Sequence, residues 1–255
     1  MASNVAWEKI FKAYNIGDHD FAKKPFFLSS GQIKDATRNF RETRHRESRI
    51  LCKQDTRSDR PDVFVERGLF ILPVKNGHYA IIQGEGYMDI PAIHSKPITY
   101  KSKLNFELET TKIGNSEMQH LDLAYASSII RTFMNDPSLV LTIRGRKYSP
   151  QLSFKVGENE ILVESVQTEV DAGYEGEEQI VLVEAKNRNA NNTIIRQLYY
   201  PFKQWTENSS KKVITLFFDK DHEQDLYRIW HFEFTDPNDY NSIQLVRSER
   251  FKMSK

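Results

Sequence analysis

The sequence predicts a mixed α/β (α+β) protein in which helices flank a mixed sheet. Apolar residues recur with helical and then with strand-like spacing through most of the second half of the chain. In the first half, an Asn-Gly pair separates two apolar runs, as in a β-hairpin. A length of 255 residues with 39% hydrophobic and 28% charged residues suits one large or two modest domains.

The first of two expected domains covers residues 1–100 and begins with short helices. Apolar side chains form one stripe from Trp7 to Tyr14, which predicts an amphipathic helix. Ser29 or Ser30 can cap a second helix, which leads into an arginine-rich stretch.

A β-hairpin is expected to follow these helices. Its first arm is the β-like segment Val63–Val65 followed by Leu69–Val74, and its second arm is Tyr79–Ile82. The turn Lys75-Asn76-Gly77 joins them. Short helices followed by a hairpin are the order of a winged helix-turn-helix, in which one helix enters a DNA groove.

The second expected domain covers residues 101–255, beyond a boundary placed between Pro91 and Lys103. Its elements follow the order α-β-β-β-α-β, with one further strand. We expect helices at 116–134 and 192–205, and strands at 139–143, 161–171, 180–183, 213–218 and 226–234.

The net charge of +1 hides three charged segments. Residues 34–60 carry nine Lys/Arg and five Asp/Glu, residues 151–185 carry one Lys and nine acids, and residues 186–212 carry six cations and one acid. An acidic block between basic ones suits a metal site on a polyanion-binding surface. Two solvated faces of opposite sign are the alternative.

The first basic segment offers candidate DNA contacts. Arg38, Arg41 and Arg44 have i, i+3, i+6 spacing and would face phosphates or base edges if a helix continues through them. A solvated helix paired with Glu42 and Glu47 is the alternative. The expected DNA-binding cations are Lys34, Arg38, Arg41, Arg44, Arg144 and Arg146.

Glu184-Ala185-Lys186 ends the most apolar strand. Alternation along a strand places Glu184 and Lys186 on one face and Ala185 on the other. A hairpin centred between Glu177 and Glu178 would pair Glu184 with Asp171, which ends the preceding strand. An exposed strand end with Lys186 paired to Glu184 is the alternative.

Two directly opposed carboxylates destabilise a sheet unless a cation lies between them. A hard, oxygen-seeking ion such as Mg²⁺ suits that position. Such an ion polarises a phosphate and lowers the pKa of bound water. Lys186 could orient the attacking water, deprotonate it, or neutralise charge on the phosphorus oxygens.

Residues 167–175 and 180–187 resemble the PD-(D/E)XK nuclease motif, in the form found in type II restriction endonucleases. The expected α-β-β-β-α-β order is similar to the common core of that superfamily. The resemblance covers roughly residues 111–220 and, more weakly, the N-terminal third. Val170 replaces the proline of the motif, at a variable position.

The resemblance also assigns roles to individual residues. Asp171 and Glu184, with the carbonyl of Ala185, become the metal ligands, and Lys186 becomes the catalytic lysine. Glu117 and Gln197 match helix positions that reach the active site in the family. Glu169 shares the face of Asp171 and is the strongest candidate for an extra ligand.

The function implied is a Mg²⁺-dependent, sequence-specific endonuclease for double-stranded DNA, a restriction enzyme that forms a homodimer. A cognate DNA methyltransferase would protect host sites. One alternative is a structure-selective repair or junction nuclease with the same core. Another is a non-catalytic winged-helix DNA-binding regulator.

The cysteine content and the lack of a secretion signal or long apolar run predict a cytoplasmic protein. A single cysteine, Cys52, leaves no internal disulfide and suits a reducing compartment. The N-terminus shows no basic region followed by an apolar one, so we do not expect secretion. With a mean hydropathy of -0.60 and no long apolar run, no membrane association is expected.

Overall fold

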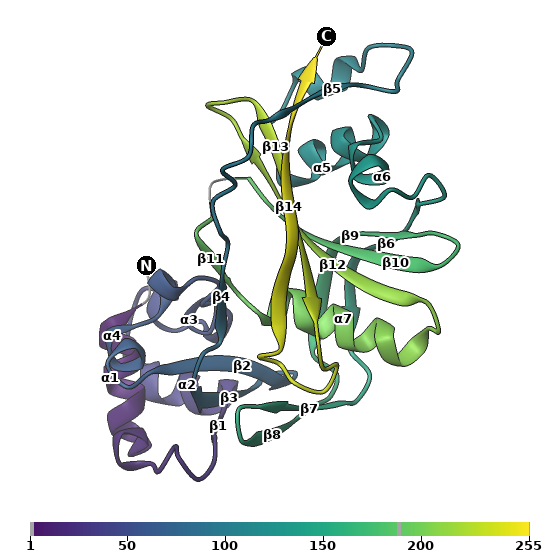
Figure 1. Ribbon diagram of the computed structural model, residues 1–255. Coiled ribbons are helices and arrows are strands. Elements are labelled where there is room, and N and C mark those ends of the chain that lie inside the picture. The colour runs from purple at the N-terminus through teal and green to yellow at the C-terminus, as the bar shows by residue number, and fades with distance from the viewer. Residues whose placement is uncertain (1–2, 188–189, 255) are drawn as a thin grey trace.

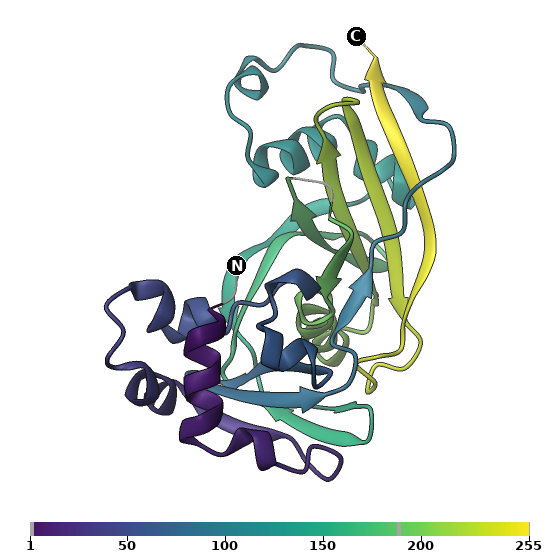
Figure 2. The same cartoon turned by 90° about the vertical axis from the view of Figure 1, so that its left-hand side faces the viewer.

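A computed structural model describes residues 3–187 and 190–254 (Figure 1). It has a mixed α+β fold with several sheets, which confirms the predicted fold class. An N-terminal unit of short helices and a small sheet packs at one end of a larger unit that contains a seven-stranded sheet (Figures 1 and 2).

The N-terminal unit contains a three-stranded sheet with strand order β1-β3-β2. Ser29 caps α2 in a capping box with Gln32, as its sequence position indicates. Trp7 and Phe64 are fully buried and lie edge to face at 4.7 Å between ring centroids, so α1 packs on α4. The elements are α1 (Asn4–Ala13), β1 (Phe26–Ser29), α2 (Ser30–Thr37), α3 (Ser48–Leu51), α4 (Asp62–Val65), β2 (Leu69–Lys75) and β3 (His78–Gln83).

Two expectations for this unit are wrong. The arginine helix does not form: α2 ends at Thr37, Arg38 is its C-cap, and Arg44 lies in the short 3₁₀ turn Thr43–His45. Residues 38–47 contain one large apolar side chain, so no amphipathic face packs to hold a helix there. Residues Val63–Val65 belong to α4, because Pro61 starts a helical turn and Phe64 enters the core.

The larger unit is built on a sheet with strand order β5-β14-β13-β12-β10-β9-β6. Helices α5 and α6 cover one face and α7 the other (Figure 1). Its elements are β4 (Tyr87–Asp89), β5 (Ile98–Lys101), α5 (Glu117–Ala126), α6 (Ile129–Met134), β6 (Val140–Tyr148), β7 (Leu152–Val156), β8 (Asn159–Val163), β9 (Gln167–Glu175), β10 (Gln179–Lys186), β11 (Asn192–Ile194), α7 (Arg196–Asn208), β12 (Lys212–Asp221), β13 (Leu226–Phe234) and β14 (Ile243–Ser254).

Three expected elements of the larger unit are wrong in extent. The helix at 116–134 is two helices, because Ser128 adopts a left-handed φ of 68° between them. The strand at 161–171 is also two, since Ser165 turns the chain with a φ of 53° between β8 and β9. The helix expected from residue 192 begins at Arg196, because residues 192–194 form β11 and pair with β4.

The register between β9 and β10 sets the positions of Asp171 and Glu184. The expectation that Asp171 ends its strand is wrong, because β9 starts after the turn at Ser165 and continues to Glu175, so that Asp171 lies in its middle. The strands are antiparallel, and Val183 lies opposite Ala172. One further step along each strand reaches Glu184 and Asp171, as expected for a turn centred between 177 and 178. Strand β12 runs parallel to β10 on its other side.

Hydrogen bonds join the two units at two separate edges. At one edge, Ile194 N–H donates to the carbonyl of Asp55, and Arg57 N–H donates to the Asn192 side chain. At the other edge, the Tyr200 hydroxyl donates to the carbonyl of Pro73 at 3.0 Å, and Lys75 pairs with Glu164. Among the described residues, no helix is long and apolar enough to span a bilayer.

Candidate functional site

The candidate site lies where β9 and β10 carry their acidic residues side by side. The backbone N–H of Ala185 donates to Oδ2 of Asp171 at 2.8 Å, which ties the two strands together at this level. Ala185 itself is fully buried in the core between the sheet and helices α5 and α6. The expected alternation is therefore confirmed, with Glu184 and Lys186 on the opposite face from Ala185.

Glu184 is a buried carboxylate, with only 8% of its surface exposed. Burial raises its pKa to about 7, although the neighbouring Lys186 charge opposes the shift. Lys186 Nζ donates to Glu184 Oε1 in a short ion pair. Burial also raises the pKa of Asp171, while the hydrogen bond from Ala185 lowers it. The pair of acids thus shares one partly buried cation.

Lys186 keeps its positive charge in this setting. Burial alone lowers the pKa of a lysine, but the attraction of Glu184 and then Asp171 outweighs burial and raises the pKa of Lys186. The ammonium group is therefore available as a donor of hydrogen bonds and of positive charge. Its ion-pair partner, Glu184, is one of the two acids of the pair.

Two helices contribute further polar side chains. Glu117 is the first residue of α5, after the capping Ser116, and its Oε1 accepts from the backbone N–H of Asn187 at 3.0 Å. Gln197, in the first turn of α7, accepts from the Thr193 hydroxyl at 2.6 Å. Both side chains line the cavity that holds Asp171, Glu184 and Lys186.

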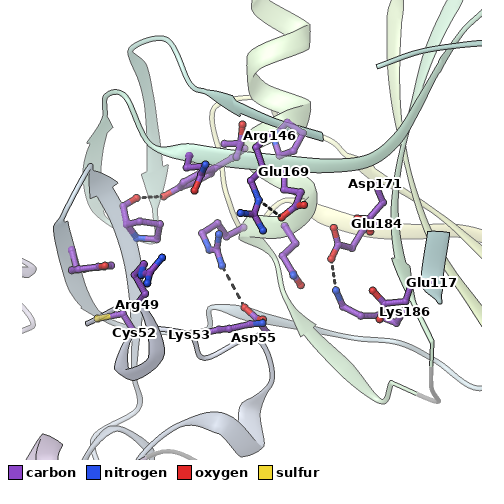
Figure 3. Close-up of a pocket in the computed structure, with 18 residues that line it drawn as sticks. Arg49, Cys52, Lys53, Asp55, Glu117, Arg146, Glu169, Asp171, Glu184 and Lys186 are labelled. Atoms are coloured by element: carbon purple, nitrogen blue, oxygen red, sulfur yellow. Dashed lines mark hydrogen bonds and ion pairs between the residues drawn. The ribbon is translucent and has the colours of Figure 1, made fainter. Parts of the chain in front are cut away.

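That cavity has a volume of about 550 Å³ and lies between the two units (Figure 3). The N-terminal unit supplies part of its wall, including Arg49, Lys53 and Asp55. Sequence reasoning missed these three residues. The only available signal was the positive charge of segment 34–60, which does not say which cations face a cavity 120 residues away along the chain.

The expected DNA-binding cations divide into two groups. Arg146 lines the cavity and pairs with Glu169, which also lines it, at 3.1 Å. The other five do not line it. Lys34 pairs with Glu47, Arg38 with Asp35, Arg44 with Glu42 and Arg144 with Asp122, and Arg41 is exposed.

Comparison with known families divides the chain in two. Residues 82–252 match the family described as a domain of unknown function, DUF6997, and residues 4–81 match a second such domain, DUF6996. The chain therefore belongs to the DUF6997 family and carries the DUF6996 domain before it. The two matches meet inside β3.

No curated protein matches the chain significantly. No solved structure does so either.

Proposed function

We propose that this protein is a Mg²⁺-dependent endonuclease that hydrolyses phosphodiester bonds in double-stranded DNA at specific sequences, as a type II restriction enzyme. The observation that carries the proposal is the set of Asp171, in the middle of β9, and Glu184 and Lys186, at the end of the adjacent strand β10, inside one cavity. Two carboxylates and a lysine in this arrangement suit metal-assisted attack of water on a phosphate.

The arrangement of elements supports a PD-(D/E)XK core. Helix α5, strands β6, β9 and β10, helix α7 and strand β12 follow the order α-β-β-β-α-β, with α6, the hairpin β7–β8 and the short strand β11 inserted between them. The N-terminal unit supports a winged-helix interpretation, since β2 and β3 form a hairpin after the short helices and β1 pairs with β3.

The donor set fits a divalent cation with a preference for oxygen. Asp171 and Glu184 offer carboxylate oxygens and Ala185 a carbonyl, and Glu169 lies in the same cavity as a candidate further ligand. Burial raises the pKa of Glu184 and of the half-buried Asp171, and a bound cation would offset that effect by favouring their charged forms. When bound, Mg²⁺ would polarise the phosphate and lower the pKa of the attacking water.

Residues of the chain then have distinct tasks. Attack of a water oxygen on phosphorus forms one P–O bond and breaks another. The water gives up one proton to the solvent, and the leaving oxygen takes one up. Lys186 would leave Glu184 to orient the water or to neutralise the developing charge on the phosphorus oxygens. Glu117 holds the backbone of Asn187, the residue after Lys186, and so positions the lysine. Gln197 borders the same space from α7.

A palindromic site would be cut by a homodimer that presents one cavity to each strand. In a restriction system, a cognate methyltransferase would protect the host DNA, and the protein would act in the cytoplasm. These features rest on the resemblance to restriction endonucleases.

The first experiment is to incubate the full chain with unmethylated phage DNA in Mg²⁺ or in EDTA. We expect discrete Mg²⁺-dependent bands, whose ends give the cut site. Lys186→Ala should abolish the bands while DNA still shifts in a binding gel. A smear would contradict sequence specificity and indicate a nuclease of low specificity. If the DNA stays intact and the wild-type chain and Lys186→Ala bind it equally, the result would favour a non-catalytic DNA-binding regulator and contradict the proposal.

A further inference from the structure

The charges of the cavity are separated across it. Three cations, Arg49, Lys53 and Arg196, and one acid, Asp55, line one end, which has a formal charge of +2. At the other end, Glu117, Asp171 and Glu184 surround Lys186, and the formal charge is -2. The pair Arg146–Glu169 lies between the two ends (Figure 3).

The cations at the positive end differ in what already neutralises them. Lys53 and Arg196 share one carboxylate, Asp55, at 3.6 and 3.5 Å. For Arg49, no ion pair is found among residues 3–187 and 190–254. An anion that enters the cavity can therefore bind Arg49 without breaking an existing ion pair, and it gains a second contact from two cations that share one acid.

The walls of the cavity are held at a fixed spacing. The hydrogen bonds of Asp55 and Asn192 tie the two units at one edge, and the bond from Tyr200 to Pro73 ties them at the other. Widening the cavity would break contacts at both edges. Its dimensions are therefore a property of the folded chain rather than of a movable lid.

The size of the cavity limits what can enter. A volume of about 550 Å³ lies in the range of roughly 300–1,000 Å³ that encloses one small molecule. A paired duplex is much larger than this volume, so the part that enters the cavity is at most a nucleotide of one strand with its flanking phosphates. The ring of Tyr79 and Pro73 also line the cavity and offer apolar surface to a base.

We infer that the cavity binds one polynucleotide strand with a nucleotide out of the base stack, the scissile phosphate at the acidic end and a neighbouring phosphate at Arg49, Lys53 and Arg196. The inference rests on the proposed nuclease function and specifies its substrate. The unstacked nucleotide comes either from single-stranded DNA or from extrusion out of a duplex. The N-terminal unit thereby forms half of the strand-binding site.

The test uses the full chain with Lys186→Ala, which keeps the DNA intact, in Mg²⁺. The probes are a fluorescently labelled 20-nucleotide single strand, its duplex, and the duplex with one unpaired nucleotide. We expect the strand and the bulged duplex to bind at least about tenfold more tightly than the paired duplex, since only they offer an unstacked nucleotide without unpairing. A preference for the paired duplex with all its bases stacked would overturn the inference.

Two arginine variants locate the contact. Arg49→Gln should weaken binding of the strand by about tenfold, as for loss of one charge-assisted hydrogen bond. Arg46→Gln is the matched control, because Arg46 is equally exposed in the same segment but does not line the cavity. We expect it to weaken binding by less than about threefold. Equal effects of the two variants would overturn the inference.

The source of the nucleotide is resolved with 2-aminopurine placed beside the cut site found in the phage DNA digest. A rise in fluorescence when duplex binds would show extrusion. A quenched signal, with tight binding confined to single strands, would show a single-strand substrate.

The two proposals can fail separately. Mg²⁺-dependent cleavage by the wild-type chain with no effect of Arg49→Gln on binding would contradict the strand-binding inference but not the proposed nuclease function. Strand binding that depends on Arg49, without any cleavage by the wild-type chain, would contradict the proposed nuclease function but not the strand-binding inference.

Discussion

The acidic end of the cavity and the arginine-rich segment of the N-terminal unit were both conspicuous in the sequence, but only the first has the geometry that its spacing indicated. Asp171 and Glu184 lie on regular strands, where a period of two and one turn centre fix every side chain. Arg38 and Arg44 lie beyond a helix that ends at Thr37. Spacing therefore predicts geometry only where burial enforces a regular element.

The largest expected effect tests the acidic end. Glu184→Ala should lower the single-turnover cleavage rate by about a thousandfold or more, because it removes a ligand from the proposed metal site. Glu175→Ala is the matched control, since Glu175 lies on the same strand as Asp171 but pairs with Lys211 and does not line the cavity, and we expect little loss. An active Glu184→Ala protein with a native circular dichroism spectrum would exclude Glu184 as a metal ligand.

Glu184 should also make the stability of the metal-free protein depend on pH. Its pKa is near 4.5 when unfolded and about 7 when folded, so between these values the folded state binds the extra proton. The free energy of unfolding should therefore fall as pH rises from 4.5 to 7, by at most about 3 kcal/mol. Lys186 titrates far above this window.

Urea denaturation in EDTA at pH 5 and pH 8 measures this dependence. Glu184→Gln cannot titrate and should show a weaker decline than the wild-type chain. Parallel declines in the two proteins would assign the pH dependence to other groups.

The smallest expected effects test the arginine-rich segment. Arg38→Ala and Arg41→Ala should each weaken duplex binding about threefold and reduce the slope of log affinity against log salt by about 1, as for loss of one phosphate contact. A salt titration by fluorescence anisotropy provides the measurement. Unchanged affinity and slope would place the DNA elsewhere and leave Arg49 and Lys53 as the contacts of this segment.

Much of the larger unit was predictable from its sequence. The strand Leu226–Phe234 has the expected bounds, because apolar residues dominate it. Strand β14 was not expected, since more than half of its residues are polar and its first half is mostly exposed. The break at Ser165 was also not expected, because a single left-handed residue leaves no mark on the apolar pattern.

The site was predictable only in part. Asp171, Glu184 and Lys186 follow from local pairing in one hairpin. Arg49 and Asp55 reach the cavity through contacts between the two units, such as the hydrogen bond that Ile194 N–H donates to the carbonyl of Asp55. No local pattern encodes those contacts, because they depend on how two separately folded cores pack together.

The boundary between the two domains of unknown function has a consequence for engineering the chain. The positive end of the cavity draws Arg49, Lys53 and Asp55 from residues 4–81, and its acidic end belongs entirely to residues 82–252. A fragment beginning at residue 82 would expose the acidic pair on an open surface. Chimeras that exchange the first domain would therefore exchange about a third of the residues that line the cavity, and with them the fit for a substrate, while leaving Asp171 and Glu184 unaltered.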